Sequence, residues 1–291
     1  MNPFRDEGGS HYYRQTGEPA YETPIATGAR KGEMRPTTLR DARKENLFPS
    51  ITTCLKGYPK AALDAWILEQ AVLARHNYAP PDDAAGPIES MATATEAQKI
   101  YLGHVKTLAN AKRDAAAARG NEIHHGAEAI LKGETWNDQD PHLVALNEWI
   151  GNNVAGVYFL ERSVVNLELK VAGRLDACVE LVDRPGVWVL DYKGRGFAHT
   201  KRHGWRAKPR KTDLIQLAFY ASTMDGPPRV ANLYVANDSD EPRIEFKEYT
   251  PEDQAEALEA LRHVVKVWQY ESGYAPQVDP DAILEAMEAK P

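Results

Sequence analysis

The motif Gly173-Arg174-Leu175-Asp176, followed after a strand and a turn by Val189-Leu190-Asp191-Tyr192-Lys193, decides the fold of this 291-residue chain. The residues between the two motifs are rich in Val and Leu, which favour strands. They are interrupted by the turn sequence Asp183-Arg184-Pro185-Gly186. We therefore predict a β-hairpin whose strands, residues 175–182 and 187–193, turn about the middle of that sequence.

The two acidic motifs are expected to face one another across this hairpin. In the register that the turn favours, Lys193 lies opposite Asp176, and Asp191 lies opposite Cys178. Because side chains alternate between the faces of a strand, both carboxylates and the lysine would converge on one face. Two carboxylates suit a hard divalent cation, and a lysine beside them can orient a water or stabilise phosphate charge. A surface salt-bridge cluster is the alternative, but the motifs have apolar neighbours, namely Leu175, Val189 and Leu190.

Helical and strand patterns surround the hairpin. Apolar residues at helical spacing predict helices over residues 61–73, 93–118, 120–132 and 141–152. Runs rich in Val, Leu and aromatic residues predict further strands over residues 154–160, 164–171, 230–237 and 243–249. Two later helices are expected over residues 211–224 and 252–271. Helices before and after a central run of strands predict an α/β (α+β) domain with a mixed central sheet flanked by helices.

Domain boundaries follow from composition. Residues 1–45 are polar and rich in Gly, Pro and charge, so we expect a partly disordered N-terminal arm. The remaining residues, 46–291, are expected to form one domain. Its helical part spans residues 46–153 and its sheet core spans residues 154–275.

Composition limits the classes of function. The formal net charge of −7 does not rule out nucleic acid, because a local basic patch is what contacts phosphate. Cys54 and Cys178 are the only cysteines, so a disulfide framework and a four-cysteine metal site are both excluded. No run approaches the roughly 20 apolar residues of a membrane span, and the first residues lack a signal-peptide core. We expect a cytoplasmic protein without membrane contact.

The order of these motifs resembles that of the PD-(D/E)XK nuclease superfamily, which has a restriction-endonuclease-like core. Within it, the chain is most similar to the RecB-like and phage-type exonucleases and to the mitochondrial genome maintenance exonucleases. Arg119-Gly120-Asn121-Glu122-Ile123-His124 looks like the family's helix motif, which places a His near the metal. Glu128 shares a helix face with His124 at the i, i+4 spacing.

Other segments support the resemblance. Gln216 and Tyr220 form a Q-x-x-x-Y pattern, which in the family supports the site and the bound strand. Glu161 sits where some relatives carry another acid. Phe48-Pro49-Ser50-Ile51-Thr52-Thr53, with the downstream Lys60-Ala61-Ala62-Leu63, also resembles the N-terminal region of phage and mitochondrial members.

The resemblance implies a metal-dependent DNA exonuclease of phage-type recombination, repair or replication. One or two Mg²⁺ or Mn²⁺ ions would be held by His124, Asp176, Asp191 and the backbone carbonyl of Tyr192. Asp176, Asp191 and Lys193 would be catalytic. We expect no iron–sulfur cluster and no nucleotide cofactor, because the cysteines and a P-loop are absent.

The implied partners are DNA with a free end and a recombination or replication protein, in the bacterial host cytoplasm if the gene is phage-encoded. Two alternatives stay open. One is a structure-specific endonuclease of the same fold, and the other is a non-catalytic nucleic-acid-binding module. The intact Asp176, Asp191 and Lys193 argue against the second alternative, because binding alone does not need a buried acid pair.

A basic segment follows the hairpin. From Lys193 to Lys211 there are eight Lys or Arg residues and no Asp or Glu. His199, His203 and Trp205 lie among them, so a base could stack while cations hold phosphates. A solvated, flexible loop is the alternative. The expected DNA contacts are Arg119, Arg195, Lys201, Arg202, Trp205, Arg206, Lys208, Arg210 and Lys211.

Overall fold

The computed structural model describes residues 10–59, 61–226, 228–281 and 283–284. The chain divides into two compact units. The core unit is Met1–Tyr58 with Ile123–Pro291, and the helical unit is Pro59–Glu122. The sequence predicted one domain after an arm. The helical unit instead has a small core of its own, formed by Ala74, Ala84, Tyr101, Val105 and Ala109.

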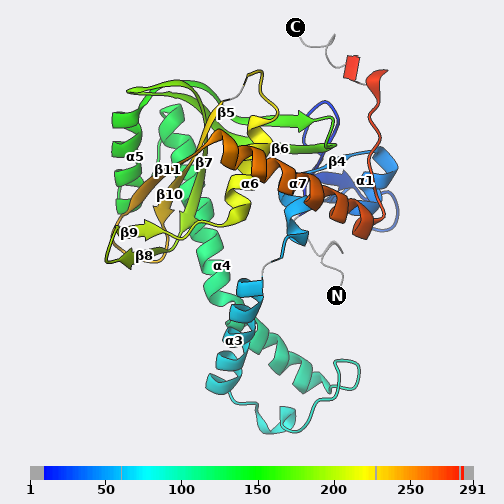
Figure 1. Ribbon diagram of the computed structural model, residues 1–291. Coiled ribbons are helices and arrows are strands. Elements are labelled where there is room, and N and C mark those ends of the chain that lie inside the picture. Colours follow the sequence, from blue (N-terminus) through cyan, green and yellow to red (C-terminus); the bar gives the residue numbers. More distant parts are fainter. Residues whose placement is uncertain (1–9, 60, 227, 282, 285–291) are drawn as a thin grey trace. The chain divides into compact units, whose positions relative to one another are not determined.

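A five-stranded sheet in the order β11-β10-β7-β6-β5 forms the centre of the core unit (Figure 1). Its strands are β5 (Val154–Asn166), β6 (Val171–Leu181), β7 (Arg184–Arg195), β10 (Arg229–Ala236) and β11 (Ile244–Tyr249). Neighbouring strands are antiparallel except for β7 and β10, which run parallel. The sheet is therefore mixed, as the sequence predicted.

Helices cover both faces of this sheet. One face packs on α6 (Lys211–Ala221) and α7 (Pro251–Ser272), through buried residues that include Cys178, Val189 and Leu261. The other face packs on α5 (Pro141–Asn153) and on the last turns of α4 (Glu96–Lys132), through residues that include Trp188 and Leu146. This arrangement, visible in Figure 1, confirms the expected fold class.

The β6–β7 hairpin forms in a register two residues away from the expected one. Cys178 pairs with Val189 in place of Asp191, and after a further register shift beyond Glu180, Leu181 pairs with Arg184. The chain therefore turns at Val182 and Asp183, before the expected turn at Arg184 and Pro185. Asp183 has a φ of 58°. Asp tolerates this left-handed conformation better than most residues. A shift of two residues leaves every side chain on its expected face, because strand side chains alternate with period two.

The described part of the expected N-terminal arm is folded. Its elements are β1 (Tyr12–Tyr13), β2 (Glu22–Pro24), β3 (Met34–Pro36) and α1 (Leu39–Glu45). β1 pairs with β4 (Phe48–Pro49), and Tyr12 and Tyr13 are each 2% exposed. Polar composition favoured a loose arm, but these aromatic residues supply enough buried surface to hold the segment on the core unit. Residues 1–9 lie outside the described residues.

The remaining elements are helical. They are α2 (Ile51–Cys54), α3 (Ala61–Asn77) and the short 3-10 helices η1 (Leu55–Gly57) and η2 (Asp82–Ala84). α4 is continuous where two helices were predicted, since Gly120 lies within it without a break. Likewise, β5 is one strand where two were expected. Over the part of the chain that is described, no helix combines the length and apolarity needed to cross a membrane.

Candidate functional site

The candidate site lies where β6 and β7 separate. Their pairing ends at Ala177 and Leu190, after which β7 continues beside β10 with Asp191 opposite Asn232. In the opening between the strands, an Asp176 carboxylate oxygen accepts a hydrogen bond from the backbone N–H of Tyr192 at 2.9 Å. The Asp176 side chain thus supplies the hydrogen-bond acceptor for the Tyr192 N–H, at a point where the β6 backbone no longer pairs with β7. This bond fixes the carboxylate at the branch point.

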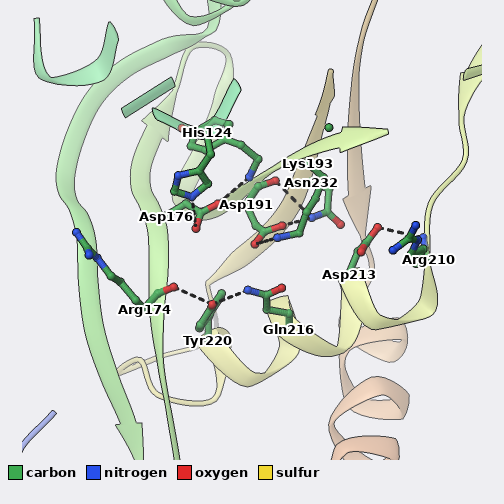
Figure 2. A network of polar contacts seen from close by, with 12 residues as sticks. His124, Arg174, Asp176, Asp191, Lys193, Arg210, Asp213, Gln216, Tyr220 and Asn232 are labelled. Carbon is green, nitrogen blue, oxygen red and sulfur yellow. Dashed lines mark hydrogen bonds and ion pairs between the residues drawn. The ribbon is translucent and has the colours of Figure 1, made fainter. Parts of the chain in front are cut away.

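His124, Glu161 and Asp176 meet at this branch point and form what we call the acid–histidine cluster. His124 Nε2 lies 3.0 Å from Asp176 Oδ1 and 3.5 Å from Glu161 Oε1. One ligand atom from each residue lies within 4.8 Å of the others, a spacing at which the three could hold a metal ion. Figure 2 shows the His124 ring above the Asp176 carboxylate.

Glu161 reaches the cluster through an unusual backbone conformation. Its neighbours Leu160 and Arg162 pair with Ala177 and Leu175, which places Glu161 opposite Asp176. Its φ of 50° lies in the left-handed region. A non-glycine residue held there costs roughly 1–3 kcal/mol and is common at functional sites. Arg174 accompanies the glutamate, with its Nε 2.6 Å from Glu161 Oε2.

Asp191 lies outside the acid–histidine cluster and is fully buried. Its Oδ1 accepts a hydrogen bond from Lys193 Nζ at 2.7 Å, and its Oδ2 accepts one from Asn232 Nδ2 at 2.7 Å. Both carboxylate oxygens are therefore bonded to groups of the protein. The structure brings together two members of the expected ligand set, His124 and Asp176. The third member of the cluster is Glu161 and not Asp191.

Hydrogen bonds continue from Asn232 into the protein. The Asn232 side-chain oxygen accepts from the hydroxyls of Tyr234 and Tyr249, each at 3.1 Å. Asp213 Oδ2, at 3.3 Å, is an alternative acceptor for the single proton of the Tyr234 hydroxyl, and Asp213 pairs with Arg195 at 2.5 Å. We call these residues the buried network, which Figure 2 shows in part: Asp191, Lys193, Arg195, Asp213, Asn232, Tyr234 and Tyr249.

The charged groups of the acid–histidine cluster shift one another's pKa values. The hydrogen bond with Asp176 raises the pKa of His124 to about 9, despite the opposing effect of burial. Burial would raise the pKa of Asp176, but the His124 hydrogen bond and the Lys193 charge outweigh it and lower that pKa. Burial raises the pKa of Glu161. In the absence of an ion, His124 therefore carries the positive charge between the two acids.

The buried network contains a coupled acid and base. Burial raises the pKa of Asp191 to about 7, although the charge of Lys193 opposes the shift. For Lys193, burial acts to lower the pKa, and the negative charges of Asp191 and Asp176 outweigh it and raise the pKa. Lys193 is thus a cation held between the network and the acid–histidine cluster.

The Q-x-x-x-Y residues join α6 to the site strand. Gln216 Nε2 donates to the Tyr220 hydroxyl at 2.7 Å, and that hydroxyl donates to the Arg174 carbonyl at 2.8 Å (Figure 2). Beside them, a Cβ on Gly173 would lie 2.9 Å from Phe219 Cε1. Only glycine permits so close an approach, so Gly173, Gln216 and Tyr220 together set the distance between β6 and α6.

A pocket of about 200 Å³ opens at the acid–histidine cluster. Its lining includes all three cluster residues, together with Arg174, Gln216 and Tyr220. His11, Tyr13 and Tyr21 from the N-terminal segment, with Ser50, Ile51 and Thr52, form its other walls. The cluster therefore faces a space that a substrate can enter.

The expected basic loop is a two-stranded sheet of β8 (Phe197–Thr200) and β9 (Gly204–Ala207). We call β8 and β9, with the turn between them, the basic hairpin. Phe197 and Ala207 anchor it by packing on Tyr234 and Ala236, so the segment has regular structure where a flexible loop was the alternative. Most of its expected DNA contacts are exposed: Lys201, Arg202, Trp205, Arg206, Lys208, Arg210 and Lys211.

Two expected DNA contacts in the core unit have protein partners. The Arg195 guanidinium is bonded to the buried Asp213 carboxylate, so it is part of the buried network. Trp205 is 48% exposed, but the Arg243 guanidinium lies 3.9 Å from its ring centroid. The His199 ring lies 5.4 Å from the same ring. A base could therefore reach Trp205 only where Arg243 and His199 leave it uncovered.

The other expected site residues are not members of the cluster. Glu128 pairs with Lys132 at 2.5 Å. Arg119 belongs to the helical unit, where it pairs with Glu122 at 3.0 Å. Tyr192 supplies the N–H bonded to Asp176, and its ring centroid lies 6.4 Å from that of His124.

Sequence reasoning missed several residues of the site. Arg174 stood in the quoted motif without a role, and Asn232 is a polar residue in the buried interior of β10, between Ala231 and Leu233. A buried amide in such a strand needs a hydrogen-bonding partner, so its position was a usable signal. His11 and Tyr21 carried no comparable signal, because only the folded N-terminal segment brings them to the pocket.

Comparisons with known proteins leave the family open. No family model and no curated protein matches the chain. One similar solved structure, a "Putative exonuclease" from Eubacterium rectale, has 14% identity and a TM-score of 0.34, over 51% of this chain and 58% of that one. Another, SSO0001, has 16% identity and a TM-score of 0.30, over 75% of this chain and 89% of that one. Scores this low assign neither family nor activity.

Proposed function

We propose that this protein is a divalent-metal-dependent deoxyribonuclease that hydrolyses phosphodiester bonds. The observation that carries the proposal is the convergence of His124, Glu161 and Asp176 on a pocket, with the Lys193 cation beside them. A structural salt-bridge cluster would not need Glu161 to adopt a left-handed backbone. It would also not need to open into a cavity.

The cluster residues fit a divalent cation. One imidazole nitrogen and two carboxylate oxygens suit Mn²⁺, and the carboxylates suit Mg²⁺. His124, Glu161 and Asp176 would hold the ion. When bound, the ion would supply charge stabilisation at the scissile phosphate and a water of lowered pKa.

The protein groups around the cluster have separate tasks in this proposal. Asp176 Oδ2 is fixed by the Tyr192 N–H, so Oδ1, which lies 3.0 Å from His124 Nε2, keeps one direction. Asp191 holds the Lys193 ammonium, which can orient a water or stabilise negative charge on the phosphate. Asn232 fixes the other oxygen of Asp191 and so sets where Lys193 is held.

We further propose that the enzyme is an exonuclease that acts on DNA with a free end, in recombination, repair or replication. The basic hairpin supports this assignment. It follows directly after β7, which carries Asp191 and Lys193, and its exposed cations could guide the phosphate backbone. A structure-specific endonuclease remains the second candidate, because the same cluster chemistry would serve it.

The test is incubation of the protein with end-labelled linear DNA and with closed single-stranded circles, with Mn²⁺, with Mg²⁺ or with EDTA. We expect linear DNA to be shortened from an end when either ion is present, and circles to survive. Cutting of circles would favour the endonuclease. Absence of any cleavage by folded protein with either ion, or equal cleavage by Asp176→Asn, would overturn the proposed activity.

A further inference from the structure

The pocket at the acid–histidine cluster has a second wall that no catalytic role explains. It is built by the N-terminal segment, through His11, Tyr13 and Tyr21. This wall is fixed in place. The His11 N–H donates to Thr53 Oγ1 at 2.9 Å, and its carbonyl accepts from the Ser50 N–H at 2.8 Å. The side chains on this wall are therefore presented by a firmly held backbone.

The wall is an aromatic stack. The ring centroids of His11 and Tyr21 lie 4.6 Å apart with an interplanar angle of 35°. Behind them, Tyr13 meets Tyr21 edge-on at 5.4 Å, and the two tyrosine hydroxyls are 2.6 Å apart. Tyr13 is buried and Tyr21 is half-buried, whereas His11 is exposed. The outermost ring of the stack is therefore the imidazole, which is available to a ligand.

Aromatic rings beside a cluster that would bind a phosphate suit a nucleotide as ligand. Bases stack on such rings with little regard to sequence, since every base has a π-face. The volume of about 200 Å³ is below the roughly 300–1,000 Å³ of typical small-molecule sites. A single base can be accommodated, and a base pair cannot. Burial and the charge of Lys56 lower the pKa of His11, which favours the neutral ring.

We propose that His11, backed by Tyr21, is a stacking platform for one unpaired base of the DNA strand whose phosphate lies at the acid–histidine cluster. The substrate class is then single-stranded DNA, or a duplex end whose strand has separated, because neighbouring pairs cover both faces of an internal base and a pocket of about 200 Å³ does not admit both bases of a terminal pair. This inference rests on the proposed nuclease function for the phosphate, but the platform itself needs no metal and no cleavage.

The test is binding of a fluorescent ten-nucleotide single-stranded DNA in EDTA, followed by anisotropy, with a duplex of the same sequence as competitor. His11→Ala should weaken binding roughly 5- to 150-fold, the range expected when one stacked base loses its aromatic partner. His11→Phe keeps a ring and should stay within about threefold of the parent. His263→Ala, on the exposed side of α7, is the matched control and should change nothing.

A second pair of variants, at Tyr21, distinguishes loss of stacking from loss of folding. Tyr21→Leu removes the backing ring and should weaken single-strand binding less than His11→Ala does. Tyr21→Phe, which keeps the ring, should restore it. Equal affinity of parent and His11→Ala, no binding by the parent, or a duplex that competes as well as the single strand would each overturn the platform. Because these measurements exclude metal, their outcome is independent of whether the chain cleaves DNA.

Discussion

The acid–histidine cluster and the buried network lie side by side, and they differ in how their charges are satisfied. In the cluster, His124 serves two carboxylates, and its side chain is 30% exposed at the pocket. In the network, Asp191 is fully buried and has a partner for each oxygen. The difference fits the proposal that the cluster exchanges a proton for a metal ion, whereas the network keeps one geometry.

The largest expected effect is on cleavage. Asp176→Asn removes a cluster carboxylate, and Lys193→Ala removes the cation beside it. Each should lower the rate by at least about 10²–10³-fold, as loss of one charge-stabilising group typically does. Lys266→Ala, an exposed cation on α7, is the control and should stay near the parent rate. Single-turnover rates on labelled DNA provide the measurement, and near-parent rates in both site variants would refute the assigned roles.

The second effect compares stability between the two regions. Asp191→Ala leaves the half-buried Lys193 ammonium and the buried Asn232 amide without their bonded carboxylate, which should cost at least about 1–3 kcal/mol. Glu161→Gln should change stability by less than roughly 1 kcal/mol, because the amide keeps the size of the side chain and its oxygen can still accept a hydrogen bond from Arg174. Urea unfolding in EDTA measures both free energies. Equal destabilisation by the two variants would remove the distinction between cluster and network.

A smaller effect is the pH dependence of the metal-free protein. Folding raises the pKa of His124 from 6.5 to about 9, mainly through its hydrogen bond with Asp176. The folded state therefore binds this proton more tightly than the unfolded state does. The resulting stability is fully present below pH 6.5 and is lost as the pH rises through about 9. The stability advantage of the parent over His124→Gln should shrink across that window, and a constant difference would contradict the assignment.

The smallest effect concerns the basic hairpin, which lies outside both regions. Replacing Lys201, Arg202, Arg206 and Lys208 together should weaken DNA binding at any sequence. Each lost phosphate contact should flatten the salt dependence by roughly 0.7 on single strands. Metal affinity should be unchanged. If the fourfold variant keeps the parent affinity and salt slope, the hairpin is only a solvated surface.

Much of the fold could be predicted because periodicity reports which face is buried. The strands over residues 230–237 and 243–249, and the helix over residues 252–271, match β10, β11 and α7 closely. The hairpin register was wrong by two residues, since the left-handed Asp183 turns the chain before Pro185. Pattern alone does not encode that choice of turn.

The candidate site was only partly predictable. The resemblance to the nuclease superfamily implied that His124 and Asp176 meet, and the structure places them 3.0 Å apart. Glu161 was given a minor role, because nothing local shows that its backbone turns its carboxylate toward the cluster. Asp191 was expected beside the metal. Its hydrogen bond from Asn232 depends on the parallel pairing of β7 with β10, which brings Asn232 opposite it and cannot be read from local pattern.

Direct titration of Mn²⁺ into the metal-free protein tests the central claim, that the acid–histidine cluster is a metal site. Calorimetry should show saturable binding to the parent, and at least roughly tenfold weaker binding to Asp176→Asn and to Glu161→Gln. Glu128→Gln, on the same helix as His124 but bonded to Lys132, should bind as the parent does. No saturable binding to the parent, or parent-like affinity in both Asp176→Asn and Glu161→Gln, would contradict the account.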